Sequence, residues 1–349
     1  MLSFSEFFAM VFSNPIMFVT VLLALGVVLV NGWTDAPNAI ATCVSTKCIG
    51  VRSAIILAAV MNFLGVVIMT MINSTVAQTI YNMVDFSGDA EKSIIALCAA
   101  LFAIVLWATA AWYFGIPTSE SHALIAGLTG AAIALQGGLD GVNGAEWMKI
   151  IYGILLSTLM GFGLGYVVIK AINFLFRNVH RRKAENFFHY AEIAASSGMA
   201  FMHGAQDGQK FIGMFLFGIF LSQGITDATT FEIPIWVMIL ISVVISFGTS
   251  IGGYRIIKSV GMDMVKLSKH EGFAADFTGM FSLLTASLFG LPVSTTHTKT
   301  TAIMGIGASK RLSNVNWLVV RDMVLAWILT FPGCGLIGYL MAKLFFILF

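Results

Sequence analysis

The chain has 349 residues, of which 58% are hydrophobic and only 10% are charged, and its mean hydropathy is +0.91. Because a soluble domain carries about 25% charged residues, this composition excludes a soluble protein and predicts an all-α polytopic membrane protein. The formal net charge of +2 says little about partners. We expect the lipid bilayer around the chain, no nucleic acid and no cofactor.

Four apolar segments of the first half are predicted to form transmembrane structure, since a spanning helix needs roughly 17–25 mostly apolar residues. No cleavable signal peptide is expected, because the N-terminal MLSFSEFFAMVFSNP lacks a basic region and its apolar run continues as a span. The segments are residues 16–46, broken at 31–37; 53–72, unbroken; 93–136, two arms around a break at 115–122; and 148–176.

The second half repeats this order and two motifs. NGWTDAPNAI at 31–40 returns as HGAQDGQKFI at 203–212, and GIPTSESH at 115–122 returns as GLPVSTTH at 290–297. The two copies of each motif are separated by nearly equal intervals, from Asp35 to Asp207 and from Pro117 to Pro292. This predicts a duplication, with an N-terminal membrane repeat at 1–176, a short basic cytoplasmic linker at 177–189 and a C-terminal repeat at 190–349. The segments of the second half are 190–222, broken at 203–210; 234–252; 276–308, broken at 290–297; and 320–348.

The basic residues predict the orientation, because cytoplasmic loops are enriched in Lys and Arg. The connections between segments fall into a basic set on one side of the membrane and an acidic set on the other. This holds only if the broken segments 93–136 and 276–308 each enter and leave on one side, as a hairpin that is either re-entrant or made of two full helices. Each half then crosses an odd net number of times. We therefore predict two inverted-topology repeats in the plasma membrane, with extracytoplasmic termini and a cytoplasmic linker. The basic set is Lys47, Arg52, Arg177, Arg181, Arg182, Lys183, Arg255, Lys258, Lys266, Lys269, Lys310, Arg311 and Arg321; the acidic set is Asp85, Asp89, Glu91, Asp140, Glu146, Asp227 and Glu232.

Three carboxylates lie at the predicted breaks, namely Asp35, Glu120 and Asp207. A charge inside a bilayer costs roughly 2.5–3.5 kcal/mol, so each is a candidate functional residue. A carboxylate, freed carbonyls and the side chain of Asn38 or Gln209 form a hard-oxygen set suited to Na⁺. The alternative is that each Asp only caps a half-helix, but matched positions in two repeats favour a site.

The backbone around these aspartates is predicted to unwind. Asp35 precedes Pro37, an order typical of an N-cap followed by the first helical turn. Gly208 is expected to loosen the backbone after Asp207, and unwound backbone in a membrane must line protein or a wet cavity.

The Gly-Pro-Ser/Thr-His motifs predict an oxyanion site. Each has hydroxyl side chains directly before a helix, whose free N–H groups and positive dipole end favour an anion such as phosphate. The two hairpin tips are predicted to meet at the membrane midplane. Ordinary Ser/Thr capping of two helices is the alternative.

His122 and His297 close these motifs and are candidates for orienting or gating the hairpins, or for sensing protons. A hydrolase is disfavoured, because the chain has no GxSxG or HExxH motif and catalytic triads are not normally duplicated.

These motifs resemble those of the inorganic phosphate transporter (PiT) family of secondary carriers. GWTDAPNAIAT and HGAQDGQKFIG are similar to the family's repeated GANDxANA-type signature, and GIPTSESHALIAG and GLPVSTTHTKTTAIMG resemble its GxPVSTTH signature. The resemblance implies transport of phosphate coupled to Na⁺ or H⁺. The resemblance places Asp35 and Asp207 at the coupling-ion and substrate centre, and Ser119, Ser121, Ser294, Thr295 and Thr296 around phosphate. Together with the residue patterns, the phosphate-binding candidates are Thr118, Ser119, Ser121, Gln209, Lys210, Ser294, Thr295 and Thr296; the coupling-ion candidates are Thr34, Asp35, Asn38, Glu120, Gln206 and Asp207, with Asp35 and Asp207 as the Na⁺ ligands.

The chain departs from the family pattern at four positions. Thr34 and Gln206 stand where Asn is usual, Trp33 replaces an Ala, and Glu120 replaces a hydroxyl. Glu120 would take up the coupling proton, ligate a cation or cap its helix. A sulfate or other oxyanion permease, and less readily an ion channel or a membrane-embedded enzyme, stay open as alternatives, as does a homodimer.

Overall fold

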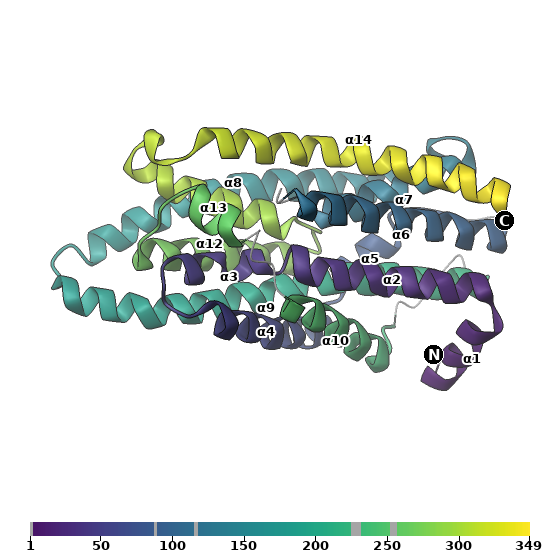
Figure 1. The fold of residues 1–349 in the computed structure, drawn as a ribbon, viewed down its shortest axis with the longest axis horizontal. Coiled ribbons are helices and arrows are strands. Elements are labelled where there is room, and N and C mark those ends of the chain that lie inside the picture. The colour runs from purple at the N-terminus through teal and green to yellow at the C-terminus, as the bar shows by residue number, and fades with distance from the viewer. Residues whose placement is uncertain (1–2, 87–88, 115–117, 225–231, 252–256) are drawn as a thin grey trace.

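The computed structural model describes residues 3–86, 89–114, 118–224, 232–251 and 257–349 (Figure 1). These residues are helical, apart from short connections and one β-bridge between Val84 and Val142, so the all-α prediction is confirmed. The helices are α1 Phe4–Ser13, α2 Pro15–Thr34, α3 Pro37–Ser45, α4 Val51–Ile72, α5 Thr75–Tyr81, α6 Ala90–Tyr113, α7 Glu120–Gln136, α8 Gly144–Leu175, α9 Arg181–Ser222, α10 Ile235–Ile251, α12 Lys269–Leu288, α13 Thr295–Lys310 and α14 Trp317–Leu348.

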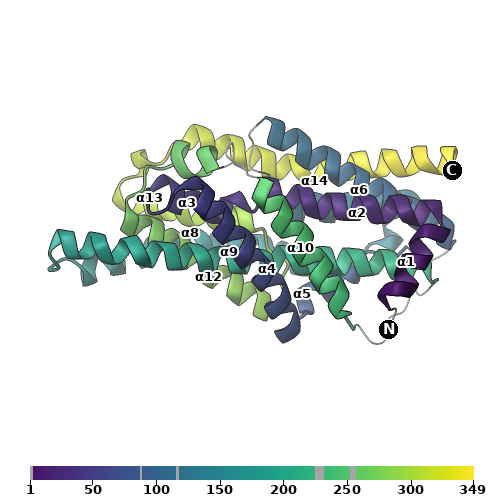
Figure 2. The same cartoon turned by 60° about the horizontal axis from the view of Figure 1, so that its bottom comes forward.

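The long helices run along the long axis of the molecule, as expected for a multi-pass membrane protein (Figure 1). Both termini lie at one end, and the turn between α8 and α9 lies at the other (Figures 1 and 2). This agrees with termini on one side of a membrane and a linker on the opposite side. Five stretches of the described residues are long and apolar enough to cross a membrane, namely Pro15–Ser45, Val51–Ile72, Ala90–Tyr113, Gly144–Leu175 and Trp317–Leu348.

The predicted break in the first span is present within residues 31–37, but the N-cap of the following helix is one residue later than predicted. Asp35 terminates α2, with its backbone N–H bonded to the carbonyl of Asn31 at 2.9 Å, and Pro37 opens α3. The residue before Pro37, Ala36, occupies the N-cap position and has no side-chain cap. The prediction that Asp35 is an N-cap is therefore wrong, and its carboxylate is available for other contacts.

The predicted break at 203–210 is wrong, because α9 is one continuous helix of 42 residues. Gly204 and Gly208 lie where α9 crosses α4, and a Cβ at these positions would overlap the backbone of Asn62 and the side chain of Val66. These glycines allow two helices to approach closely and do not unwind the backbone.

The polar segment 177–189 is largely helical, since α9 begins at Arg181. At 1.5 Å per residue α9 is about 63 Å long, roughly twice the thickness of the hydrocarbon core. Its first turns and the end of α8 accordingly project beyond the other helices (Figures 1 and 2). The apolar run at the N-terminus is also interrupted: α1 ends at Ser13, and Asn14 caps α2 through hydrogen bonds from the N–H groups of Ile16 and Met17.

Both predicted hairpins are present. The first joins α6 to α7, although residues 115–117 of its tip, with Pro117, lie outside the described residues, as do Asp227 and Arg255 of the charge pattern. The second joins α12 to α13 through Gly290, whose φ of 66° suits glycine. With 17 and 16 residues, α7 and α13 are about 26 and 24 Å long. Each is shorter than the hydrocarbon core of roughly 30 Å.

The packing of the two halves is reciprocal. Helix α7 packs on α14 and α13 on α8, while α4 packs on α9 and α10 on α2. A Cβ at Gly130 of α7 would overlap the backbone of Gly335 in α14, and one at Gly305 of α13 would overlap the backbone of Phe162 in α8. This exchange of equivalent contacts is consistent with the predicted inverted repeats.

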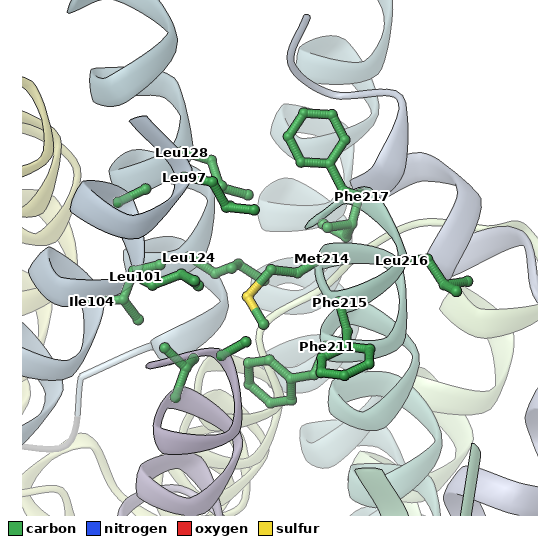
Figure 3. Packing of buried hydrophobic residues seen from close by; sticks show 14 of the residues in the cluster. Leu97, Leu101, Ile104, Leu124, Leu128, Phe211, Met214, Phe215, Leu216 and Phe217 are labelled. Carbon is green, nitrogen blue, oxygen red and sulfur yellow. The ribbon is translucent and has the colours of Figure 1, made fainter. Parts of the chain in front are cut away.

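An apolar cluster fixes α9 against the first hairpin (Figure 3). Leu97 and Leu124 of the hairpin lie opposite Phe211 and Met214 of α9, and all four are at most 1% exposed. In a membrane such contacts stabilise through van der Waals packing and not through release of water. The cluster lies one helical turn beyond Ser121 and Asp207, so it sets the position of both.

Candidate functional site

Four elements bring polar side chains together at the centre of the helix bundle: the α2–α3 turn, α9, and the first turns of α7 and α13. All of these side chains are buried, and none is more than 3% exposed. We call this set the central cluster; it consists of Asn31, Asp35, Asn38, Glu120, Ser121, His203, Asp207, Lys210, Thr295 and Thr296.

Asp35 is surrounded by neutral donors. The hydroxyl of Thr296 donates a hydrogen bond to its Oδ1, and Asn38 Nδ2 donates to the same oxygen at 2.7 Å. The hydroxyl of Thr295 donates to Oδ2 at 3.3 Å. The buried carboxylate of Asp35 therefore has dipoles around it, and no cationic side chain among the described residues bonds to it.

Asp207 has a cation beside it. Lys210 Nζ lies 2.7 Å from Asp207 Oδ1. On the other oxygen, Asn31 Nδ2 donates at 3.1 Å and His203 Nε2 lies at 3.3 Å. The continuous helix explains this arrangement, since residues three and four apart share one face of a helix.

Each aspartate contacts the hairpin of the other half. Asp35 accepts from Thr296 in α13, whereas Asp207 accepts from Ser121 in α7 at 3.5 Å. Thr295 lies within 3.5 Å of a carboxylate oxygen of each aspartate. The starts of α7 and α13, which follow the two hairpin tips in the chain, thus meet at the two carboxylates.

Ser119 and Ser294 act as helix caps. Each accepts a hydrogen bond at 3.2 Å from the backbone N–H of the histidine three residues later. They fix the starts of α7 and α13, so the positive dipole ends of both helices face the central cluster. Thr118 contributes its carbonyl, which lies 3.5 Å from the hydroxyl of Thr296.

Three predicted residues point elsewhere. Gln206 Nε2 donates to Ser287 Oγ at 2.9 Å, and Gln209 Nε2 donates to the carbonyl of Asn73 at 2.8 Å. Because α9 is unbroken, the neighbours of Asp207 in sequence lie on other faces of the helix. The hydroxyl of Thr34 donates to the carbonyl of Val30 at 2.7 Å, within its own helix.

Two residues of the central cluster were not predicted, Asn31 and His203. Each lies four residues before the aspartate of its motif. Residues four apart share one face of a helix, so a prediction that the segment before each aspartate is helical would have identified both. Asn31 has the more direct role, because its amide donates to Asp207 while its Oδ1 has no partner among the described residues.

Glu120 is the first residue of α7 and is 2% exposed. Its side chain interacts with that of Asn31, and its Oε2 has no hydrogen-bond partner in the described part of the chain. Capping alone does not account for a carboxylate that is buried to this degree.

His122 and His297 contact each other, with ring centroids 4.5 Å apart. His297 also lies against Trp327 at 3.7 Å, and His122 against Phe331 at 4.7 Å, both from α14. The pair joins the two hairpins and packs them on α14, which agrees with an orienting role.

The oxygens around Asp35 fit a hard cation, which prefers carboxylate, carbonyl and hydroxyl ligands. Asn38 Oδ1 is buried and has no partner within the described residues. It adds to the carboxylate of Asp35 and the hydroxyls of Thr295 and Thr296. Asp35, His203 and Asp207 also offer ligand atoms that lie within 4.8 Å of one another.

A second polar cluster lies one turn away along α3 and α13. Lys299 forms an ion pair with Asp276 and donates to the hydroxyl of Thr42 at 2.9 Å. Glu192 of α9 interacts with Lys299. All four residues are completely buried.

The sequence also matches known proteins over most of its length. Residues 31–184 and 176–338 each match the family described as the phosphate transporter family. A protein of Bacillus subtilis (strain 168) named "Probable low-affinity inorganic phosphate transporter" is 36% identical over 329 residues, which cover 93% of this chain and 97% of that one. A protein of the same name from Rhizobium meliloti (strain 1021) is 34% identical, with coverage of 93% and 95%.

The fold matches a solved structure entitled "The sodium-dependent phosphate transporter" with a TM-score of 0.87. The match covers 96% of this chain and 100% of the other, at 24% sequence identity. At this identity the likeness shows a shared fold.

Proposed function

This chain belongs to the phosphate transporter family, and from that premise we propose that it carries inorganic phosphate across the plasma membrane by alternating access, coupled to Na⁺ or H⁺. The family consists of transporters and not of enzymes. The observation that carries the coupling proposal is the contact of the first turns of α7 and α13 with two buried carboxylates, Asp35 and Asp207.

Charge balance explains why the anion needs a cation. Two like unit charges about 5 Å apart repel by on the order of 3 kcal/mol at an effective dielectric constant of roughly 20. Phosphate near Asp35 would meet this repulsion. A cation bound to the carboxylate removes it, so cation and anion bind together.

Hydrogen bonding gives the coupling a second source. In the structure, the hydroxyls of Thr295 and Thr296 donate to the Asp35 carboxylate. A cation on that carboxylate would take over the oxygen lone pairs and let the hydroxyl protons turn toward phosphate. The anion site therefore forms only when the cation is present.

Alternating access would come from the hairpins. Asp35, Asp207, Thr295 and Thr296 are all at most 2% exposed, so the centre is closed to both sides. Movement of the α6–α7 or the α12–α13 hairpin would open it toward one side. The occluded centre and the short α7 and α13 support this proposal.

Phosphate is favoured over sulfate by proton chemistry. Hydrogenphosphate can donate a hydrogen bond to a carboxylate, whereas sulfate carries no proton at neutral pH. The two retained aspartates and the named relatives support phosphate.

We propose that both termini are extracytoplasmic, because the basic connections lie on the opposite side. Protease digestion of terminal tags from outside intact cells tests this orientation, and protection of both tags would refute it.

Uptake of labelled phosphate by proteoliposomes tests the substrate. The purified protein should take up phosphate in a saturable manner, and excess sulfate should compete weakly. Sulfate uptake in the absence of phosphate uptake would overturn the assignment and support the sulfate alternative. Flux that does not saturate would indicate a channel.

A further inference from the structure

Lys210 is the one position where the two copies of the aspartate motif differ in charge. Three residues after Asp35 stands Asn38, and three residues after Asp207 stands Lys210. Lys210 is completely buried at the centre of the bundle. A buried ammonium is costly in a membrane, so its surroundings must compensate it.

The ammonium of Lys210 is held by three oxygens of three different kinds. Nζ lies 2.7 Å from the carboxylate of Asp207, 2.7 Å from the hydroxyl of Ser121 and 2.6 Å from the carbonyl of Val293. An ammonium has three N–H donors, and all three are used. Lys210 thus has no free donor for phosphate in this state.

This environment is that of a bound cation. A carboxylate, a hydroxyl and a backbone carbonyl are the oxygen ligands that a hard cation takes. They come from α9, from the first turn of α7 and from the loop before α13. The ammonium connects the same elements that a mobile ion at this position would connect.

The corresponding position of the first copy holds no charge. Asn38 donates its amide to Asp35 at 2.7 Å and to Thr296 at 3.2 Å, while its Oδ1 is left without a partner in the described part of the chain. Asp35 thus keeps an oxygen-lined position that lacks a built-in cation.

We propose that Lys210 is a tethered cation that permanently fills one of two symmetry-related cation positions, so that phosphate is carried with a single mobile cation bound at Asp35. This rests on the proposed cation-coupled transport and sets its stoichiometry. It also separates the two aspartates: Asp207 holds the hairpins through Lys210, and Asp35 exchanges its cation in each cycle.

The Lys210→Asn variant tests the proposal, because it restores the residue of the first copy. We would measure binding of phosphate to the full-length protein in detergent at varied Na⁺ and at varied pH. Below saturation, a tenfold rise in cation concentration lowers the Kd for phosphate about tenfold if one cation binds with it, as we expect for the wild type. If the variant binds one more cation, the same rise lowers its Kd about a hundredfold. In proteoliposomes, one more positive charge should enter per phosphate.

Lys149→Asn is the matched control, since Lys149 lies near the start of α8 in a partly exposed pair with Glu146. Its cation dependence should equal that of the wild type. If Lys210→Asn does not fold, the Asn38→Lys variant tests the proposal in the opposite direction. Its second tethered ammonium should make phosphate binding depend less on the cation concentration than in the wild type.

A folded Lys210→Asn protein with the cation dependence of the wild type would overturn the tethered-cation proposal. So would an Asn38→Lys protein that binds phosphate with unchanged cation dependence. Absence of cation-coupled phosphate uptake by the wild type itself would instead refute the proposed function.

Discussion

Thr296 and Asp35 lie 261 residues apart in the chain, yet the hydroxyl of Thr296 donates a hydrogen bond to the carboxylate of Asp35. The contact joins the second hairpin to the broken helix of the first half. Its counterpart joins Ser121 of the first hairpin to Asp207 of the second half. Through these two contacts, the charge state of each aspartate bears on the hairpin of the opposite half.

Replacing Thr296 with Val should weaken phosphate uptake. The change removes, at nearly constant volume, a hydroxyl that we propose turns from Asp35 toward phosphate, and a hydrogen bond to a charged group is worth about 1.5–3 kcal/mol. We expect KM for phosphate to rise roughly tenfold, which corresponds to about 1.4 kcal/mol. Thr298→Val is the control, because the hydroxyl of Thr298 donates within its own helix to the carbonyl of Ser294 at 2.9 Å. Equal KM values for the two variants would contradict this role of Thr296.

Glu120→Gln should retain uptake and lose part of its pH dependence. A proton on Glu120 would offer a donor to Asn31 Oδ1, and both groups otherwise have buried oxygens without partners among the described residues. Gln keeps such a donor at every pH. Initial rates of phosphate uptake across a pH series would measure the effect; an unchanged pH profile would leave Glu120 with a capping role alone.

The ion pair of Lys299 and Asp276 should contribute measurably to the thermal stability of the protein. Removing one member of a buried pair leaves an uncompensated charge and costs about 3–5 kcal/mol. Lys299→Met and Asp276→Asn should each lower the thermal midpoint in detergent, and the double variant should recover part of the loss. A double variant whose loss equals the sum of the single losses would show that the two side chains are not coupled.

His297→Phe should preserve uptake to within about twofold, because volume-conserving apolar replacements usually cost less than 1.5 kcal/mol. The ring of His297 is surrounded by His122 and Trp327, and neither ring nitrogen has a partner in the described part of the chain. We would compare the pH profile of uptake with that of the wild type. A flattened profile would assign His297 a role in proton handling instead of hairpin packing.

The predicted breaks at proline-containing motifs were confirmed, whereas the break marked by glycine alone was not. Pro37 cannot continue a helix from the preceding turn, so the end of α2 can be read locally. Gly208 permits unwinding but also permits close packing. Which of the two occurs depends on Val66 of α4, a partner that no local pattern reveals.

The same difference decided which of the predicted site residues the structure brings together. Asp35, Asn38 and Thr296 meet as expected because the break lies where the sequence marks it. Around Asp207 the expected unwound backbone favoured Gln206 and Gln209. The continuous helix instead presents His203, together with the predicted Lys210, on the face of Asp207.

The coupling claim is tested most directly by accumulation of labelled phosphate in proteoliposomes under an imposed Na⁺ or H⁺ gradient. The wild type should concentrate phosphate above its external level under one of the two gradients and release it when an ionophore dissipates that gradient. Asp35→Asn should remain folded and fail to accumulate phosphate. A wild type that accumulates phosphate under neither gradient, or an Asp35→Asn variant that accumulates it fully, would contradict cation coupling at Asp35.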